Sequence, residues 1–204
     1  EGVYLDNNMI QCTFDGRTQD VIDVKDLFIF GHHNYENVMA AVAMTVKAGV
    51  PLDIIVRVLK AFKGVEHRIE FVRELDGVTY YNDSKGTNPD SSIKALEAMT
   101  KPTLIIAGGY DKHSEFDGFI DAFGGKVKLM VLIGTTAPQI EKTARAHGFD
   151  DIINTDSLEN AVQICHDKAV SGDVVLLSPA CASWDMFKSY EERGRLFKEY
   201  VNRF

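Results

Sequence analysis

The first 65 residues alternate apolar and polar positions over short segments. Three such segments, at residues 2–5, 9–14 and 18–24, are separated by the sequences Asp-Asn-Asn and Asp-Gly. Alternation with a period of two is typical of strands, and Asp-Gly is a frequent hairpin turn. The start of the chain is therefore expected to form β-hairpins.

Two helices are expected next, because apolar residues recur at helical spacing. The face of the first helix holds Val38, Ala41, Val42 and Thr45. Asn34 is its expected N-cap, since an Asn side chain can accept from a free backbone N–H. The Gly-Val-Pro sequence at 49–51 breaks the chain before the second helix. The apolar positions of that second helix are Ile54, Ile55, Val58, Leu59 and Phe62.

Strands and helices alternate from about residue 66 onward. A hairpin over 71–82, turning at Asp76-Gly77, leads into this series. The expected strands then cover 103–107, 127–133, 150–154 and 173–177, and the expected helices 89–99, 115–123, 136–146, 157–169 and 185–202. This alternation predicts the α/β class, with an open, mainly parallel sheet and right-handed crossovers. The change of pattern predicts a domain boundary near residues 64–67, with Gly64-Val65 as a candidate hinge.

The last of these helices carries a run of large apolar residues. They are Trp184, Phe187, Leu196, Phe197, Tyr200 and Val201. A stacking platform for bases is one interpretation, but a buried helix face is favoured because the spacing is helical.

The composition of the chain argues against several classes of function. The formal net charge is −8 and no run of Lys or Arg occurs, which argues against a partner with a phosphate backbone. The longest apolar runs are far shorter than a bilayer requires, and no signal segment opens the chain, so a cytoplasmic protein without membrane insertion is expected. Three widely spaced cysteines and the adjacent His32-His33 lack the spacing of metal ligands, and no metal site is expected.

Three polar loops follow expected strands, at residues 82–88, 108–112 and 178–183. Ligands of open α/β sheets bind beyond the carboxyl ends of the strands, so these loops are the candidate site. By contrast, Gly134-Thr135-Thr136 leads directly into a helix, and either threonine is expected to cap it.

The first loop is suited to a polyphosphate or carboxylate ligand. Lys85 would supply a positive charge, Asp83 could accept from ribose hydroxyls, and Gly86 would let backbone N–H groups approach an anion. A solvated turn in which Asp83 acts as a local cap fits this loop equally well.

The other candidate positions each have two interpretations. Gly108-Gly109 lacks the third glycine of a dinucleotide fingerprint, so a tight turn is favoured there, with Lys112 as the cation of interest. Ser183 either binds an anion at the start of the last helix or simply caps it, and its surroundings do not form the Gly-x-Ser-x-Gly of an esterase. Arg68 either reaches a phosphate or is a surface charge on a linker.

Taken together, these segments resemble the Mur ligases. Residues 31–37, Gly-His-His-Asn-Tyr-Glu-Asn, resemble their G-x-H-N-x-x-N motif, and residues 67–70, His-Arg-Ile-Glu, resemble H-R-x-E. Residues 82–87 and 176–194 resemble the member of the family that adds D-glutamate. The resemblance covers essentially the whole chain in family order. It implies that residues 1–65 end a central ATP-binding domain and that residues 66–204 form a Rossmann-like C-terminal domain.

The resemblance also implies roles for residues at matching positions. The ATP-binding set would be His33, Asn34, Asn37, Asp83 and Lys85. The catalytic set would be Lys85, Arg68 and His67. The D-glutamate-binding set would be Thr87, Lys112, Ser183 and Tyr190. Two positions depart from the expected pattern: Tyr190 replaces Phe, which puts apolar packing there in doubt, and Gly86 replaces a frequent Ala.

The implied reaction is ATP-dependent peptide-bond formation. The γ-phosphoryl group of ATP would pass to the carboxylate of UDP-N-acetylmuramoyl-L-alanine, and the amine of D-glutamate would attack the resulting acyl phosphate. The family's G-x-x-x-x-G-K-[ST] loop and its Mg²⁺ ligands are not found in these 204 residues, so an inactive C-terminal fragment of a monomeric enzyme is expected. There are three alternatives: another amino-acid-adding ligase, a folate polyglutamate ligase, and a stand-alone nucleotide-binding or interaction module.

Overall fold

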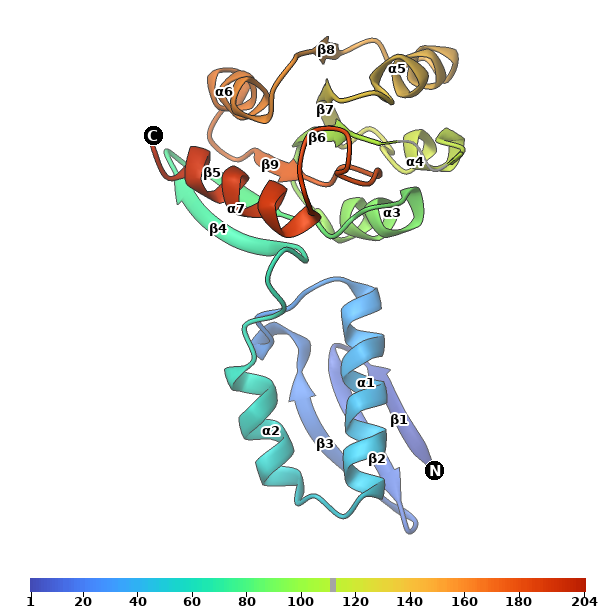
Figure 1. Ribbon diagram of the computed structural model, residues 1–204. Coiled ribbons are helices and arrows are strands. Elements are labelled where there is room, and N and C mark those ends of the chain that lie inside the picture. Colours follow the sequence, from blue (N-terminus) through green and yellow to red (C-terminus); the bar gives the residue numbers. More distant parts are fainter. Residues whose placement is uncertain (111–112) are drawn as a thin grey trace. The chain divides into compact units, whose positions relative to one another are not determined.

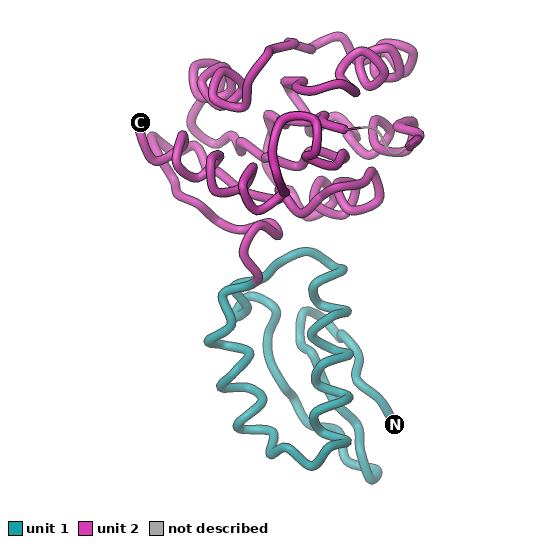
Figure 2. Tube along the Cα trace, in the orientation of Figure 1, with its two compact units in different colours: residues 1–64 teal, residues 65–204 magenta. Residues whose placement is uncertain are grey.

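The computed structural model describes residues 1–110 and 113–204 and divides them into two compact units. Unit 1 comprises Glu1–Gly64 and unit 2 comprises Val65–Phe204 (Figure 2). The boundary expected from the sequence lies within one residue of this division.

Unit 1 is a three-stranded antiparallel sheet covered by two helices (Figure 1). Its strands are β1 (Gly2–Asp6), β2 (Met9–Phe14) and β3 (Arg17–Asp23), and a short 3-10 helix follows at Val24–Asp26. Helix α1 (His32–Lys47) packs on β1 and β2, while α2 (Leu52–Ala61) packs on β3. Asn7 and Asn8 both have positive φ in the first turn, a conformation that Asn tolerates better than most residues. The expected hairpins are confirmed.

The start of α1 differs from the expectation. Its N-cap is Gly31, at φ 92°, and no side chain caps the helix. Asn34 lies inside the first turn instead, where its amide donates to the carbonyl of Phe30 at 2.8 Å. The predicted cap was wrong because Gly31 reaches a backbone conformation that a residue with a Cβ rarely adopts.

The core of unit 1 uses only part of the predicted apolar stripes. Val38 and Val42 of α1 and Ile55 of α2 are buried against the sheet. Val58 is 57% exposed and Phe62 is 43% exposed within the chain.

Unit 2 contains a six-stranded sheet in the order β4-β5-β9-β6-β7-β8. Strands β4 (Glu70–Leu75) and β5 (Val78–Asn82) form an antiparallel hairpin. The remaining pairs are parallel and join β5 to β9 (Val174–Leu177), β9 to β6 (Thr103–Gly108), β6 to β7 (Val127–Ile133) and β7 to β8 (Ile152–Asn154). The expected mainly parallel sheet is confirmed. This strand order places the carboxyl ends of β5, β9 and β6 next to one another.

Helices cover both faces of this sheet (Figure 1). Helices α6 (Leu158–Lys168) and α7 (Tyr190–Val201) pack against each other on one face. Helices α3 (Pro89–Ala98), α4 (Asp117–Asp121) and α5 (Ala137–Ala146) lie on the other. Strands β6 and β9 are buried along their whole length, as expected for central parallel strands.

The last helix begins later than the sequence predicted. It starts at Tyr190, where the side chain of the N-cap Ser189 accepts from the N–H of Glu192. Ser183 therefore precedes the helix by seven positions and does not cap it. Trp184 is 63% exposed, so its assignment to the buried helix face was wrong, whereas Phe197 and Val201 are fully buried as predicted.

All three cysteines are buried free thiols, as expected. Among the residues that the structure describes, no helix combines the length and apolar character needed to cross a bilayer.

Candidate functional site

The three polar loops of the sequence leave adjacent strands of unit 2 and are hydrogen-bonded to one another. The N–H of Gly108 donates to the carbonyl of Pro179 at 2.8 Å, and the N–H of Tyr110 donates to that of Ala182 at 2.8 Å. The loop after β6 is thereby joined to the loop after β9. The shared edge predicted for these loops exists.

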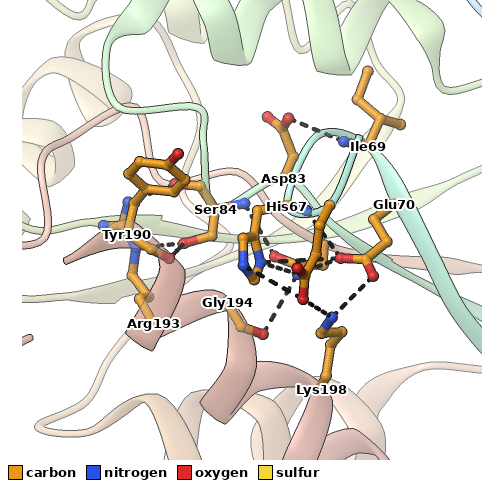
Figure 3. Close-up of polar contacts among 11 residues, drawn as sticks. His67, Ile69, Glu70, Asp83, Ser84, Tyr190, Arg193, Gly194 and Lys198 are labelled. Carbon is orange, nitrogen blue, oxygen red and sulfur yellow. Dashed lines mark hydrogen bonds and ion pairs between the residues drawn. The ribbon is translucent and has the colours of Figure 1, made fainter. Parts of the chain in front are cut away.

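Asp83, in the loop after β5, is buried and bonded within the unit. One carboxylate oxygen accepts from the hydroxyl of Ser178 at 2.7 Å. The other accepts from the N–H of Ile69 at 3.2 Å (Figure 3). Burial raises the pKa of Asp83 to about 7, since desolvation disfavours the charged form. A contact to ribose stays a prediction for this residue, and its observed partners give it a structural role.

Residue 86 must be glycine because it lies close to the carboxylate of Asp83. A Cβ at this position would lie 2.6 Å from an oxygen of Asp83 and 3.0 Å from the hydroxyl of Ser178. Close packing, as well as flexibility, therefore accounts for glycine here.

The segment 65–70 forms a strained turn. His67 has φ 66° and Ile69 has φ 44°, a left-handed region that is strongly unfavourable for a β-branched residue. The N–H of His67 donates to a carboxylate oxygen of Glu70 at 3.0 Å, and that of Ile69 donates to Asp83. These carboxylates hold the turn in place (Figure 3).

Two exposed cations lie on the strained turn and on the loop that is bonded to it. Arg68 is exposed within the turn, and Lys85 is exposed in the loop after β5. The N–H of Lys85 donates to the carbonyl of His67 at 2.9 Å, which ties the loop after β5 to the turn. The ammonium of Lys85 lies 5.7 Å from the centre of the Tyr190 ring. Lys85 and Tyr190, which were assigned to different ligands, are therefore neighbours.

His67 is 3% exposed, and its ring is part of the packing. Its Nδ1 lies 2.9 Å from the side-chain amide nitrogen of Asn82. Because that nitrogen only donates, Nδ1 accepts, and the ring proton belongs on Nε2, 3.6 Å from Glu66. A Cβ at Gly194 would lie 2.2 Å from Nδ1. Burial lowers the pKa of His67 and favours the neutral ring, and its catalytic role stays a prediction.

In the described part of the chain, one group of three side chains is spaced like metal ligands: Glu66, His67 and Glu70. The ammonium of Lys198 lies 2.6 Å from Glu66 and 2.9 Å from Glu70. These carboxylates therefore already have a cationic partner, and we interpret the group as an ion cluster that fastens α7 to the strained turn.

Arg193 is a residue that the sequence interpretation missed. Its guanidinium is fully buried and donates to the hydroxyl of Ser84 at 3.0 Å and the carbonyl of Ser84 at 2.9 Å. It also donates to the carbonyl of Cys181 at 3.1 and 3.2 Å and to that of Ala182 at 3.4 Å. A usable signal was present, because Arg193 shares a helix face with Phe197 and Val201 and so places a cation on an apolar stripe.

Thr136 occupies the N-cap position of α5, as predicted, but its side chain makes no capping bond. Its Oγ1 instead lies 3.0 Å from both the nitrogen and the oxygen of Gly109. The same oxygen lies 3.2 Å from the sulfur of Cys181. Gly109 fits because a Cβ there would lie 2.3 Å from the carbonyl of Ala182. Thr136 therefore joins the loops after β6, β7 and β9.

Three of the four D-glutamate candidates lie on the loops after β5 and β9 or at the start of α7. Thr87 lies in the loop after β5, Ser183 is buried after β9, and Tyr190 begins α7. The hydroxyl of Ser84 donates to the carbonyl of Tyr190 at 2.8 Å. Lys112 lies outside the described residues.

The remaining ATP candidates lie in unit 1, at the start of α1. Asn34 is buried, His33 is half-buried and Asn37 is exposed. Their assignments stay predictions, as do those in unit 2.

The burial of Asp83 predicts a pH-dependent stability. The folded state binds this proton more tightly than the unfolded state, so the contribution of Asp83 to stability is greatest below pH 4 and falls as the pH rises toward its folded-state pKa of about 7. We expect the parent chain to lose roughly 2–4 kcal/mol more unfolding free energy over this interval than Asp83→Asn. Urea unfolding of both chains at a series of pH values measures the difference.

Asp151→Asn is the matched control, because it removes an exposed carboxylate from the same unit. It should keep the pH profile of the parent. Identical profiles for the parent and Asp83→Asn would show that burial of Asp83 does not govern this dependence.

Similar proteins identify the family of this chain. The profile of the family described as Mur ligase, glutamate ligase domain, matches residues 67–181. The UDP-N-acetylmuramoylalanine–D-glutamate ligase of Lachnospira eligens is 57% identical over 201 residues, which cover 98% of this chain and 45% of the relative. The chain thus spans about 45% of the length of that curated relative.

Solved structures support the fold. The UDP-N-acetylmuramate-alanine ligase MurC from Thermotoga maritima matches with a TM-score of 0.68 at 16% identity, over 100% of this chain and 45% of that one. A bifunctional folylpolyglutamate synthase/dihydrofolate synthase from Yersinia pestis matches with a TM-score of 0.71 at 14% identity, over 98% and 46%. The family profile and the sequence identity, together with this shared fold, show that the chain belongs to the Mur ligase family and contains its glutamate ligase domain.

Proposed function

We propose that the chain is the C-terminal part of an ATP-dependent ligase that adds D-glutamate to UDP-N-acetylmuramoyl-L-alanine in peptidoglycan synthesis. The observation that carries the proposal is 57% identity to a relative named as that ligase. Unit 1 would be the end of the central ATP-binding domain, and unit 2 the C-terminal domain. The enzyme would act in the cytoplasm as a monomer.

The proposed reaction has two steps. A carboxylate oxygen of UDP-N-acetylmuramoyl-L-alanine attacks the γ-phosphorus of ATP, and ADP leaves. The amine of D-glutamate then attacks the acyl carbon, loses a proton, and expels inorganic phosphate. Mg²⁺ would neutralise phosphate charge in the first step. We assign no Mg²⁺ ligand to this chain, because the described group with suitable spacing already holds Lys198.

The geometry of unit 2 suits positioning and charge stabilisation. Arg68 and Lys85 are exposed cations on segments hydrogen-bonded to each other, so both are available to phosphate oxygens. Thr87, Ser183 and Tyr190 would bind the carboxylates of D-glutamate, together with Lys112. The chemistry needs no acid–base pair from this chain, because phosphoryl transfer depends mainly on electrostatics and alignment.

The fold alone does not select the amino acid. Ligases for alanine and for folate share it at 14–16% identity. Sequence identity favours D-glutamate over these alternatives and over a stand-alone nucleotide-binding or interaction module.

Amino-acid selectivity tests the proposed function. In the full-length ligase that carries this chain, phosphate release with ATP and UDP-N-acetylmuramoyl-L-alanine should depend on D-glutamate. L-Alanine, L-glutamate and diaminopimelate should give little release. Equal use of another amino acid, or no response to D-glutamate, would refute the proposal.

The two exposed cations generate a second prediction. Lys85→Ala and Arg68→Ala should each slow acyl-phosphate formation by roughly 10- to 100-fold, because each removes charge stabilisation from the transferring phosphoryl group. Single-turnover kinetics with saturating substrates measures this step. Lys142→Ala, which removes an exposed cation from α5, is the control and should be unaffected. Parental rates in both site variants would contradict the assignment.

A further inference from the structure

Among the residues that the structure describes, the hydrogen-bond acceptors of the buried Arg193 cation are all neutral. Its three nitrogens donate to the hydroxyl and carbonyl of Ser84 and to the carbonyls of Cys181 and Ala182. Burying a charge without a directly bonded anion is unfavourable, although Arg193 also satisfies carbonyls that would otherwise be buried without a partner. A neutral donor could satisfy such carbonyls without burying a charge, so hydrogen-bond satisfaction alone does not account for arginine here.

The contacts of Arg193 fix the direction of two peptide groups in the loop after β9. A trans peptide is planar, so a carbonyl that points toward Arg193 turns the N–H of the following residue in the opposite direction. For the carbonyls of Cys181 and Ala182, those N–H groups belong to Ala182 and Ser183. The guanidinium also polarises both peptides, which strengthens their N–H groups as donors to an anion.

The same side chain fixes the other two elements of the candidate site. It holds Ser84, three positions before Thr87, through both the carbonyl and the hydroxyl. The hydroxyl of Ser84 in turn donates to the carbonyl of Tyr190 at 2.8 Å (Figure 3). One buried group therefore connects the segments that carry Thr87, Ser183 and Tyr190.

We propose that Arg193 is a positioning residue for the carboxylate site of the incoming amino acid, which it serves by aligning the loops after β5 and β9 with the start of α7. The proposal rests on the proposed function, since it assigns those loops to D-glutamate. It adds a residue that would act through the loop backbone without touching the substrate.

The test compares Arg193→Met and Arg193→Lys in the full-length ligase. Arg193→Met should raise the KM for D-glutamate by roughly 10- to 100-fold, because misplacing a binding group by about 1 Å has effects of this order. The KM for ATP should rise by a clearly smaller factor, because Arg193 reaches the ATP-side Lys85 only through Ser84. Arg193→Lys keeps the charge but lacks the guanidinium fork, and should give an intermediate KM for D-glutamate.

Arg195→Met is the matched control, because it removes an exposed arginine from the same helix. It should leave both KM values at the parental level. Ser84→Ala keeps Arg193 and removes the hydroxyl that joins it to Tyr190. It should raise the KM for D-glutamate by roughly 2- to 10-fold over the parent, the effect of losing a hydrogen bond. This variant keeps the test decisive if the Arg193 variants do not fold.

The outcomes separate the two proposals. A parent enzyme that does not use D-glutamate overturns the proposed function and this inference together. An active parent, with an unchanged KM for D-glutamate in the folded variants, overturns the inference alone. Equal increases in KM for D-glutamate and ATP also overturn it, because a general loss of structure would affect both substrates.

Discussion

Backbone polar groups that become buried where three loops leave adjacent parallel strands must find hydrogen-bond partners. In unit 2 these partners are side chains from distant parts of the chain. Arg193 binds the carbonyls of the loops after β5 and β9, Asp83 joins Ser178 to the strained turn, and Thr136 holds Gly109. The architecture of the candidate site depends on this buried set.

The buried set separates structural from ligand-facing roles. His67, Asp83 and Arg193 are nearly inaccessible, whereas Arg68 and Lys85 are exposed on the segments that they support. Such a division suits a site that acts through fixed charges, because cations on a preorganised backbone need no rearrangement when a phosphate binds. The strain at His67 and Ile69 fits the same picture, since surrounding hydrogen bonds hold an unfavourable turn that carries Arg68.

The sheet and its polar edge were predictable because they follow from local patterns. Apolar strand segments alternate with helical ones, and the polar loops follow three of the strands directly. Element ends were less predictable. Asn34 was predicted to cap α1, but Gly31 is the N-cap. Trp184 was predicted to be buried because the segment before Tyr190 was expected to be helical.

The buried polar contacts were not predictable from local patterns, because their partners lie far apart in the chain. Arg193 and Ser84 are separated by 109 positions, and Thr136 and Gly109 by 27. The sequence does contain a signal for Arg193, which is a cation on an apolar helix face. It contains no signal for the contact between Thr136 and Gly109, because a threonine before a helix is ordinarily a cap. The ligands of the site were assigned from the family resemblance. The chemistry of the loops agrees with that assignment but does not by itself identify the ligands.

We propose that the loops after β5 and β9, held together by Arg193, bind the amino-acid substrate. A crystal structure of the full-length ligase with D-glutamate and a non-hydrolysable ATP analogue would test this proposal. We expect the carboxylates of D-glutamate within hydrogen-bond distance of Thr87 and Ser183, while Arg193 keeps its bonds to Ser84 and Cys181. D-glutamate bound at another edge of the sheet, or bound there with the Arg193 contacts broken, would contradict it.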